Sequence, residues 1–183
     1  MGALVEGDSV GMNMFNERVV ANVRPFVGRQ QLYVVLRSLV NPKNYGGRCD
    51  YSAALKETSS VLASHSILMI VSDFIGLKEE DKRILRMAAR KYDLAAFIIR
   101  DPRDGELPSG LNLVTVSDPY SGEQLVIDVE KVRDAYAAEA KKELNELEAF
   151  FKSSRIDYVL LDTSKPFIEP LVGFFRRRQQ KIK

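Results

Sequence analysis

Residues 67–76 read "ILMIVSDFIG", and this stretch indicates the class of fold. Five apolar residues, Ile67 to Val71, run directly into Ser72 and Asp73. A short apolar run that ends in turn-forming residues predicts a strand buried on both faces. In sheets of this kind ligands gather at the carboxyl ends of the strands. Asp73 is therefore the first candidate for a functional residue.

Helices and further strands alternate on both sides of this segment. A second apolar run, "LAAFIIRD", ends in Asp101, and "IDYVLLDT" is the last expected strand. Helical spacing or capping residues indicate helices near residues 29–40, 51–63, 78–92, 129–152 and 166–180. Asp50 and Asp128 stand at two expected N-caps. This order predicts an α/β fold with a mostly parallel, doubly wound, Rossmann-like sheet and helices on both faces.

Two pairs of short strands are expected to be antiparallel. Residues 9–15 and 18–23 flank the polar pair Asn16-Glu17 and predict a hairpin at the edge of the sheet. Residues 111–118 and 124–129 flank the turn "PYSGE" and predict two further short strands. The long helix that follows has apolar residues on one face, namely Val132, Tyr136, Leu144, Leu147 and Phe151.

Length and composition indicate an ordinary soluble domain. The 183 residues suffice for one domain, residues 1–183, with 45% hydrophobic and 28% charged residues. The net charge of +2 is too balanced to indicate nucleic-acid binding. A single cysteine, Cys49, allows no internal disulfide and fits a cytoplasmic location. No apolar stretch reaches the roughly 20 residues that a membrane-spanning helix needs.

Several kinds of catalytic or phosphate-binding site are not supported by the residues. The chain has one histidine, His65, which is expected to be a strand-entry residue without function. A histidine-rich metal site or a Ser-His-Asp triad therefore cannot readily be built. The glycine patterns that cradle phosphate groups in nucleotide-binding proteins are also absent from the sequence.

The acids at the strand ends remain as candidates. Oxygen ligands grouped at a sheet edge suit Mg²⁺, which prefers octahedral oxygen coordination. The alternative for Asp73 is structural: it caps a helix or accepts a hydrogen bond from a backbone N–H after the strand. Spacing alone favours the structural role.

Several segments along the chain are similar to those of a known family, namely "GDSVGMNMF", "GGRCDYSAAL", "ILMIVSDF", "IIRDPRDGELPSG" and "VSDPYSGEQL". The DP…LP…G run and the SGE turn after it are the most specific part of the match. On these segments the chain resembles the von Willebrand factor A-like region of the domain-of-unknown-function-58 family. The ending, "YVLLDTSKPFIEPLVGFFRRR", is also similar to the end of the family's region.

The resemblance implies a metal-ion-dependent adhesion site that is incomplete in this chain. In von Willebrand A domains, Mg²⁺ is held by a D-x-S-x-S motif, a threonine and an aspartate after the fourth strand. Asp73 matches that aspartate, Cys49 falls at the threonine position with Asp50 beside it, and D-x-S-x-S has no counterpart. A thiol is a soft ligand poorly suited to Mg²⁺. We therefore expect no bound cofactor, with Mg²⁺ as the one cation considered.

The resemblance also implies that the first strand and most of the first helix are missing from an N-terminally incomplete domain. That strand would lie between the strands at residues 9–15 and 67–73. Unpaired backbone groups at such edges are costly when buried. We expect either that these two strands pair directly or that another chain fills the gap, which would favour a homo-oligomer formed through exposed sheet edges.

By the same resemblance, the expected function is non-enzymatic protein interaction. The expected partner is a MoxR-type AAA+ ATPase in a chaperone-like system that assembles or matures other complexes. The alternative is a small-molecule hydrolase that uses Asp73 and Asp101 as acid and base. The residues expected to contact the partner are Asp73, Asp101, Arg103, Asp104 and Glu106.

Basic residues close the chain and permit two interpretations. They could bind anionic lipid or nucleic acid, or they could complement the dipole at the end of the last helix. The second interpretation is favoured, with neither nucleic acid nor membrane expected as a partner. The residues concerned are Arg176, Arg177, Arg178, Lys181 and Lys183.

Overall fold

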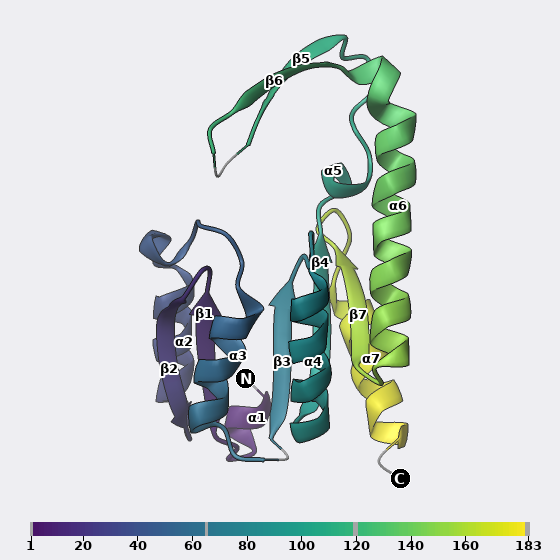
Figure 1. Ribbon diagram of the computed structural model, residues 1–183. Helices are drawn as coiled ribbons and strands as arrows, with labels where there is room; N and C mark the ends of the chain where they lie inside the picture. Colours follow the sequence, from purple (N-terminus) through teal and green to yellow (C-terminus); the bar gives the residue numbers. More distant parts are fainter. Residues whose placement is uncertain (1, 65, 119–120, 182–183) are drawn as a thin grey trace. The chain divides into compact units, whose positions relative to one another are not determined.

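The computed structural model describes residues 2–64, 66–118 and 121–181 (Figure 1). His65 and Lys183, which the sequence analysis considered, lie outside the described residues. The chain forms two compact units, one of Met1–Ser64 with Glu79–Leu85 and one of His65–Lys78 with Arg86–Lys183. The structure is of the mixed α/β type, and the strands in the described residues form three separate sheets.

The first unit is built around an antiparallel hairpin. Strand β1 pairs with β2, and helices α2 and α3 both contact the two strands. Turn and breaker residues in "NPKNYGGR" separate the two helices. The elements are α1 (Gly2–Val5), β1 (Val10–Phe15), β2 (Val19–Phe26), α2 (Gln30–Leu39), η1 (Pro42–Asn44) and α3 (Tyr51–Val61).

Polar side chains fasten these helices to the hairpin. The amide of Gln31 is buried and donates to the carbonyls of Val10 and Arg24, at 2.7 and 2.8 Å. A buried amide that reaches two carbonyls in this way avoids the cost of an unsatisfied polar group. On α3, the hydroxyl of Thr58 accepts from the side chain of Asn13 at 2.8 Å.

The second unit contains a three-stranded parallel sheet in the order β3-β4-β7. An antiparallel hairpin of β5 and β6 precedes the long helix α6. Helix α4 begins in the residues of the first unit and ends in those of the second. The elements are β3 (Ile67–Ser72), α4 (Glu79–Lys91), β4 (Asp93–Arg100), α5 (Pro102–Gly105), β5 (Leu113–Ser117), β6 (Gln124–Asp128), α6 (Val129–Ser153), β7 (Asp157–Asp162) and α7 (Ile168–Lys181).

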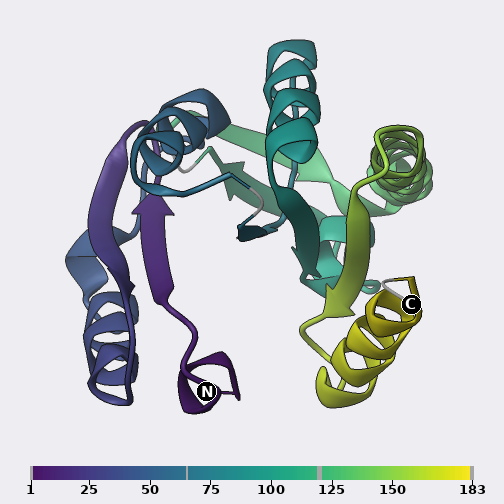
Figure 2. The same cartoon turned by 90° about the horizontal axis from the view of Figure 1, so that it is seen from below.

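Helices cover both faces of the parallel sheet (Figure 2). On one face Phe97 packs edge-on against Phe174 of α7, with ring centroids 5.3 Å apart. On the other, Phe151 of α6 is fully buried and its ring lies 5.7 Å from that of Tyr158 of β7. Because successive residues of a strand point to opposite faces, the apolar run of β4 supplies both cores.

Arg178 of α7 holds together the starts of two neighbouring strands. Its guanidinium donates to the carboxylate of Asp157 at 2.8 Å and also to that of Asp93. The arginine side chain is only 11% exposed. Arg178 therefore serves the packing of α7 on the sheet, a role that neither interpretation of the basic residues had included.

Two sequence-based expectations about the strands are corrected. The strand β3 is not buried on both faces, since Ile67 and Val71 are 61% and 62% exposed. The reason is its place at the edge of the sheet, whereas α7 packs over the neighbouring β4 and β7. The predicted edge hairpin is not part of the parallel sheet, because the described strands form one parallel sheet and two separate antiparallel hairpins.

Direct pairing of β1 with β3 is not seen. Among the described residues, β2 is the strand that pairs with β1, and β4 is the strand that pairs with β3. The alternative, that another chain supplies the missing strand, stays a prediction. As to membranes, the helices in the described part of the chain are too short or too polar to cross a bilayer.

Candidate functional site

Because the strands are parallel, the carboxyl ends of β3, β4 and β7 lie at the same end of the sheet. We call this end, with the loops that follow the three strands, the rim. The register pairs Ser72 with Ile98, and Arg100 with Asp162. Asp73 follows β3, Asp101 follows β4, and Asp162 ends β7. Parallel pairing alone therefore brings these carboxylates to one end of the sheet, as the sequence predicted.

Asp73 stabilises its own turn. Its Oδ1 accepts a hydrogen bond from the backbone N–H of Ile75 at 3.1 Å. The hydroxyl of Ser72 accepts from the N–H of Phe74 at 3.2 Å. Side chains that accept from the backbone two residues onward are typical of tight turns. The structural role that the sequence analysis favoured for Asp73 is confirmed.

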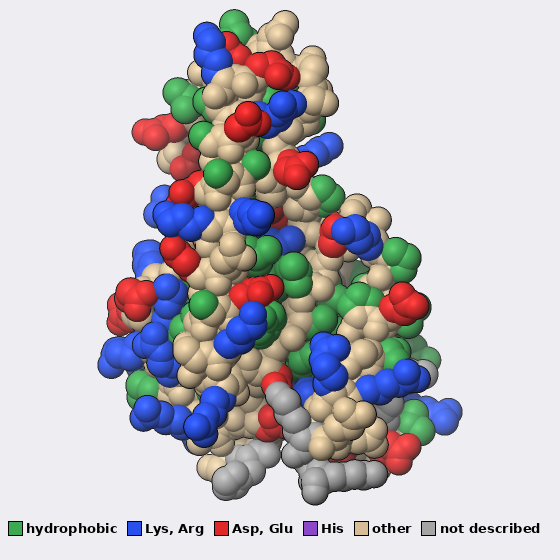
Figure 3. Space-filling model, turned by 90° about the vertical axis from the view of Figure 1, so that its right-hand side faces the viewer, with side chains coloured by type: hydrophobic (Ala, Val, Ile, Leu, Met, Phe, Trp, Pro, Cys, Tyr) green, Lys and Arg blue, Asp and Glu red, His purple; other side chains and the backbone are tan. Residues whose placement is uncertain are grey.

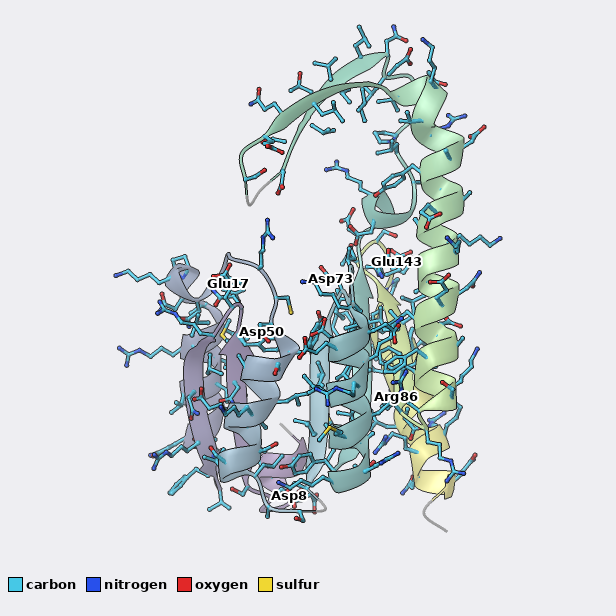
Figure 4. The ribbon with its side chains drawn as sticks, viewed as in Figure 1. Asp8, Glu17, Asp50, Asp73, Arg86 and Glu143 are labelled. Carbon is cyan, nitrogen blue, oxygen red and sulfur yellow. The ribbon has the colours of Figure 1, made fainter. Side chains whose placement is uncertain are left out.

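The turn after β3 is fixed by α6 as well as by its own side chains. Phe74 has a positive φ of 55°, which is costly for a bulky residue, and its ring is fully buried 5.2 Å from that of Phe151. Glu143 of α6 accepts from the N–H of Gly76 at 3.0 Å. Figure 4 shows Glu143 near Asp73 at the rim. Aromatic packing and two carboxylates thus hold one backbone conformation.

Asp101 caps a short helix within the second rim loop. Its Oδ1 accepts from the N–H of Arg103 at 2.9 Å, and Asp104 accepts from the N–H of Asp101 at 2.8 Å. This reciprocal arrangement is a capping box. The other oxygen of Asp101 accepts from the hydroxyl of Thr163, after β7, at 3.2 Å. Asp101 therefore links the loops that follow two adjacent strands.

Helix α6 fastens the same loop at two further points. The hydroxyl of Tyr136 donates to the carbonyl of Arg103 at 3.0 Å. Glu130 accepts from the N–H of Gly110 at 3.2 Å. Burial, and then the negative charge of Asp104, raise the pKa of Tyr136 above its ordinary value of 10.0. The neutral, donating form of the phenol is therefore retained into the alkaline range.

Asp162, at the end of β7, accepts hydrogen bonds within the turn that follows it. Hydrogen bonds from the hydroxyl and N–H of Ser164 lower its pKa to about 2, with a smaller contribution from Lys165. The hydroxyl donates at 2.6 Å and the N–H at 2.9 Å. Asp162 thus also closes a turn, and its charge persists at any physiological pH.

The residues proposed as magnesium ligands do not fit a complete site. Asp73 uses a carboxylate oxygen for Ile75, and Asp50 caps α3 by accepting from Ala53 at 3.0 Å. Cys49 is exposed in the first unit. In residues 2–64, 66–118 and 121–181, no group of three or more His, Cys, Asp or Glu side chains is arranged to hold a metal ion.

Two of the residues proposed to contact a partner remain available for contact. Arg103 and Glu106 are exposed on the loop after β4. Neither side chain forms an ion pair within the part of the chain that the structure describes. The carboxylates of Asp73, Asp101 and Asp104 instead hold the backbone that presents them. The rim thus combines a fixed backbone with exposed charges of both signs.

Comparison with protein families identifies the chain. The family model described as "Protein of unknown function DUF58" matches residues 2–146. The chain belongs to the DUF58 family. The match includes β3, β4 and the loop between β4 and β5, so the first two rim segments are part of the family's region.

This DUF58 chain is similar in sequence to uncharacterized mycobacterial proteins. It is 25% identical over 177 residues to the uncharacterized protein Rv1480 of Mycobacterium tuberculosis, covering 95% of this chain and 55% of the relative. It is 26% identical over 157 residues to the uncharacterized protein MAV169 of Mycobacterium avium, covering 84% of this chain and 91% of that one. The chain therefore spans about half the length of the first of these relatives.

A solved structure shares the fold. The crystal structure of the conserved hypothetical protein BatB from Bacteroides thetaiotaomicron aligns with a TM-score of 0.56 at 11% identity. The alignment covers 98% of this chain and 84% of that chain. At this identity the likeness shows the fold alone.

Sequence reasoning did not identify the residues that fix the rim from α6 and β7. Tyr136 was read only as an apolar position of a helix, and Glu143 and Thr163 were not singled out. The helical spacing places Tyr136 and Glu143 seven residues apart, on the same face of α6. This shared face could have indicated that the two residues act together. Which loops they contact could not be inferred from their spacing.

Proposed function

We propose that this DUF58 chain is a von Willebrand factor A-like interaction domain without enzymatic activity. Its partner would be a MoxR-type AAA+ ATPase in the cytoplasm, within a chaperone-like system that assembles or matures other complexes. The choice of this partner rests on the resemblance to the family. The proposal depends most on the loop of residues 101–110. That loop is held by α6, by Thr163 after β7 and by its own capping box, and it exposes the charged side chains of Arg103 and Glu106.

Preorganisation is the physical reason to assign binding to this loop. Ordering a flexible loop upon association costs about 0.5–1.5 kcal/mol for each immobilised side chain. Here Asp101, Tyr136 and Glu130 already hold the backbone. Arg103 and Glu106 are then presented without further ordering of the main chain, which favours specific recognition of a charged surface.

A structural role for the acids also supports a non-enzymatic function. Asp73 and Asp101 each accept a hydrogen bond from a backbone N–H in the turn that follows their strand. An acid–base pair would instead direct its carboxylates to a substrate. Turnover of phosphate or ester substrates that is lost in Asp73→Asn would contradict this part of the proposal.

The direct test is binding of the chain to a MoxR-type ATPase from the same organism, measured by biolayer interferometry with ATP and with ADP. Exchanging the loop charges by Arg103→Glu together with Glu106→Arg is expected to weaken binding about tenfold or more. The far-ultraviolet circular dichroism of the variant should equal that of the wild type, because neither side chain supports the loop.

Lys141→Glu provides the matched control. It reverses an exposed charge on α6 that lies on another face of the helix than Tyr136 and Glu143, which hold the rim, and should leave binding within about twofold of the wild type. Absence of binding by the wild-type chain under both nucleotide conditions would refute the assigned partner. Equal binding by the loop variant would refute the assigned surface.

A further inference from the structure

The hairpin of β5 and β6 carries an aliphatic face that is half-buried near the helix and exposed toward the turn. The register pairs Val114 with Ile127 and Val116 with Leu125, so these side chains share one face. Val116 and Leu125 are 40% and 64% exposed. A two-stranded hairpin alone is marginally stable in water, and an apolar face of this kind indicates a binding surface. We call these four residues the hairpin face.

A second exposed apolar surface lies on α7. Ile168, Leu171, Val172 and Phe175 recur at helical spacing and line a shallow hollow of ≈ 490 Å³. Ile168 and Phe175 are 65% and 45% exposed. Hydrophobic side chains are visible next to Lys and Arg on the side of the molecule that presents α6 and α7 (Figure 3). We call these four residues the α7 stripe.

The two surfaces have complementary charges. Residues 111–128 include Asp118, Glu123 and Asp128, of which Asp128 pairs with Lys131, but neither lysine nor arginine. The α7 stripe is followed directly by Arg176 and Arg177, which form no ion pair within the described residues. An acidic apolar face and a basic apolar stripe suit each other, because the charges select the partner while the apolar contact supplies affinity.

Their dimensions also agree. Each hairpin strand has five residues, which span roughly 16 Å. From Ile168 to Phe175 the stripe rises about 10 Å, so a hairpin strand laid along it also extends past Arg176 and Arg177. With the strands laid along the helix, the acids near the hairpin turn reach the end of the stripe that carries the arginines.

We propose that the hairpin face of one copy of this chain packs over the α7 stripe of a second copy. The hairpin of the same copy leaves the stripe exposed, since it continues into α6, which covers the opposite face of the sheet from α7 (Figure 2). The contact joins two different surfaces, so it supports either a reciprocal dimer or a head-to-tail assembly. It involves neither the rim nor the edge of β3.

The first test is the molar mass of the full chain as a function of concentration at low salt, measured by sedimentation equilibrium. We expect self-association in the wild type, weakened about tenfold or more by Leu125→Ser on the hairpin face and by Ile168→Ser on the α7 stripe. Val126→Ser is the matched control. Val126 is 62% exposed but points to the other face of the hairpin, so its substitution should leave association unchanged.

Mixing separates this contact from other modes of association. Leu125→Ser retains an intact α7 stripe and Ile168→Ser an intact hairpin face, so an equimolar mixture should form a heterodimer that neither variant forms alone. Glu123→Arg and Arg176→Glu should each weaken association, and combining them should restore it.

A wild-type chain that stays monomeric at every concentration would overturn the proposal and assign both surfaces to other proteins. Association that persists in both serine variants would overturn it as well. Since Arg103 and Glu106 lie outside this contact, loss of ATPase binding and loss of self-association are distinguishable.

Discussion

The two ends of α6 have similar apolar spacing but different surroundings. Near its end, Leu147, Phe150 and Phe151 are buried, and Phe151 packs against Tyr158 of β7. Near its start, Val129 is buried, but Val132 and Tyr136 are 36% and 38% exposed. We therefore expect the end of the helix near the sheet to contribute more to stability. The other end holds the rim loop and the hairpin, where exposed groups are available for partners.

Phe151→Ala should have the largest effect and tests the first half of this comparison. The ring is fully buried and contacts Phe74, Phe150 and Tyr158. Its removal should lower the free energy of unfolding by about 3–5 kcal/mol, as measured by urea denaturation. Val132→Ala, at the exposed end of the same helix, should cost less than about 1 kcal/mol. Equal costs would contradict the comparison.

Arg178→Met should have the next largest effect. The substitution removes the cation that holds Asp93 and Asp157 together at the start of the sheet. We expect a loss of about 2 kcal/mol in the free energy of unfolding. The neighbouring substitution Arg177→Met should change it by less than about 0.5 kcal/mol, because Arg177 is exposed. A larger loss for Arg177→Met than for Arg178→Met would contradict the stabilising role of the contacts of Arg178 with Asp93 and Asp157.

Asp101→Ala should have a smaller effect, confined to the rim. Loss of the capping hydrogen bond should cost about 1 kcal/mol of unfolding free energy. It should also weaken ATPase binding, because the loop that presents Arg103 loses its support. Arg103→Ala should weaken the same binding at unchanged stability. Unaltered stability in Asp101→Ala would show that the capping box does not hold the loop.

Asp162 gives the smallest effect, which depends on pH. Its pKa is about 2 in the folded chain, below the ordinary value of 3.8. A depressed folded pKa stabilises the fold above the unfolded pKa, and this contribution is lost as the pH falls through about 2. The difference in melting temperature between wild type and Asp162→Asn should therefore be present near pH 5 and shrink toward pH 2. A difference in melting temperature that does not change with pH would indicate that the substitution acts through altered packing and not through the charge of Asp162.

Local signals in the sequence predicted much of the fold. The apolar runs before Asp73 and Asp101, the cap at Asp50 and the turn residues between β5 and β6 indicated elements that the structure contains. Such features depend on neighbours along the chain. The position of a capping residue was predicted more accurately than its contacts. Asp128 occupies the N-cap position of α6, as expected, but its carboxylate pairs with Lys131 at 3.0 Å and makes no capping hydrogen bond.

Features that depend on distant residues could not be predicted. The exposure of Ile67 and Val71 follows from the edge position of β3, which an apolar run does not encode. Arg178 was grouped with its basic neighbours because its two carboxylate partners lie 85 and 21 residues away. The grouping of carboxylates at one rim was predicted, because parallel strands require it, but their use in turns was not certain from spacing.

Hydrogen–deuterium exchange of the full chain, with and without the ATPase, tests the central claim most directly. We claim that the rim is a preformed docking surface. Without the ATPase, the backbone amides of residues 101–110 should exchange more slowly than those of β5 and β6, and the ATPase should add protection in residues 101–110. Rapid exchange of the loop in the isolated chain, or added protection confined to the hairpin, would contradict the claim.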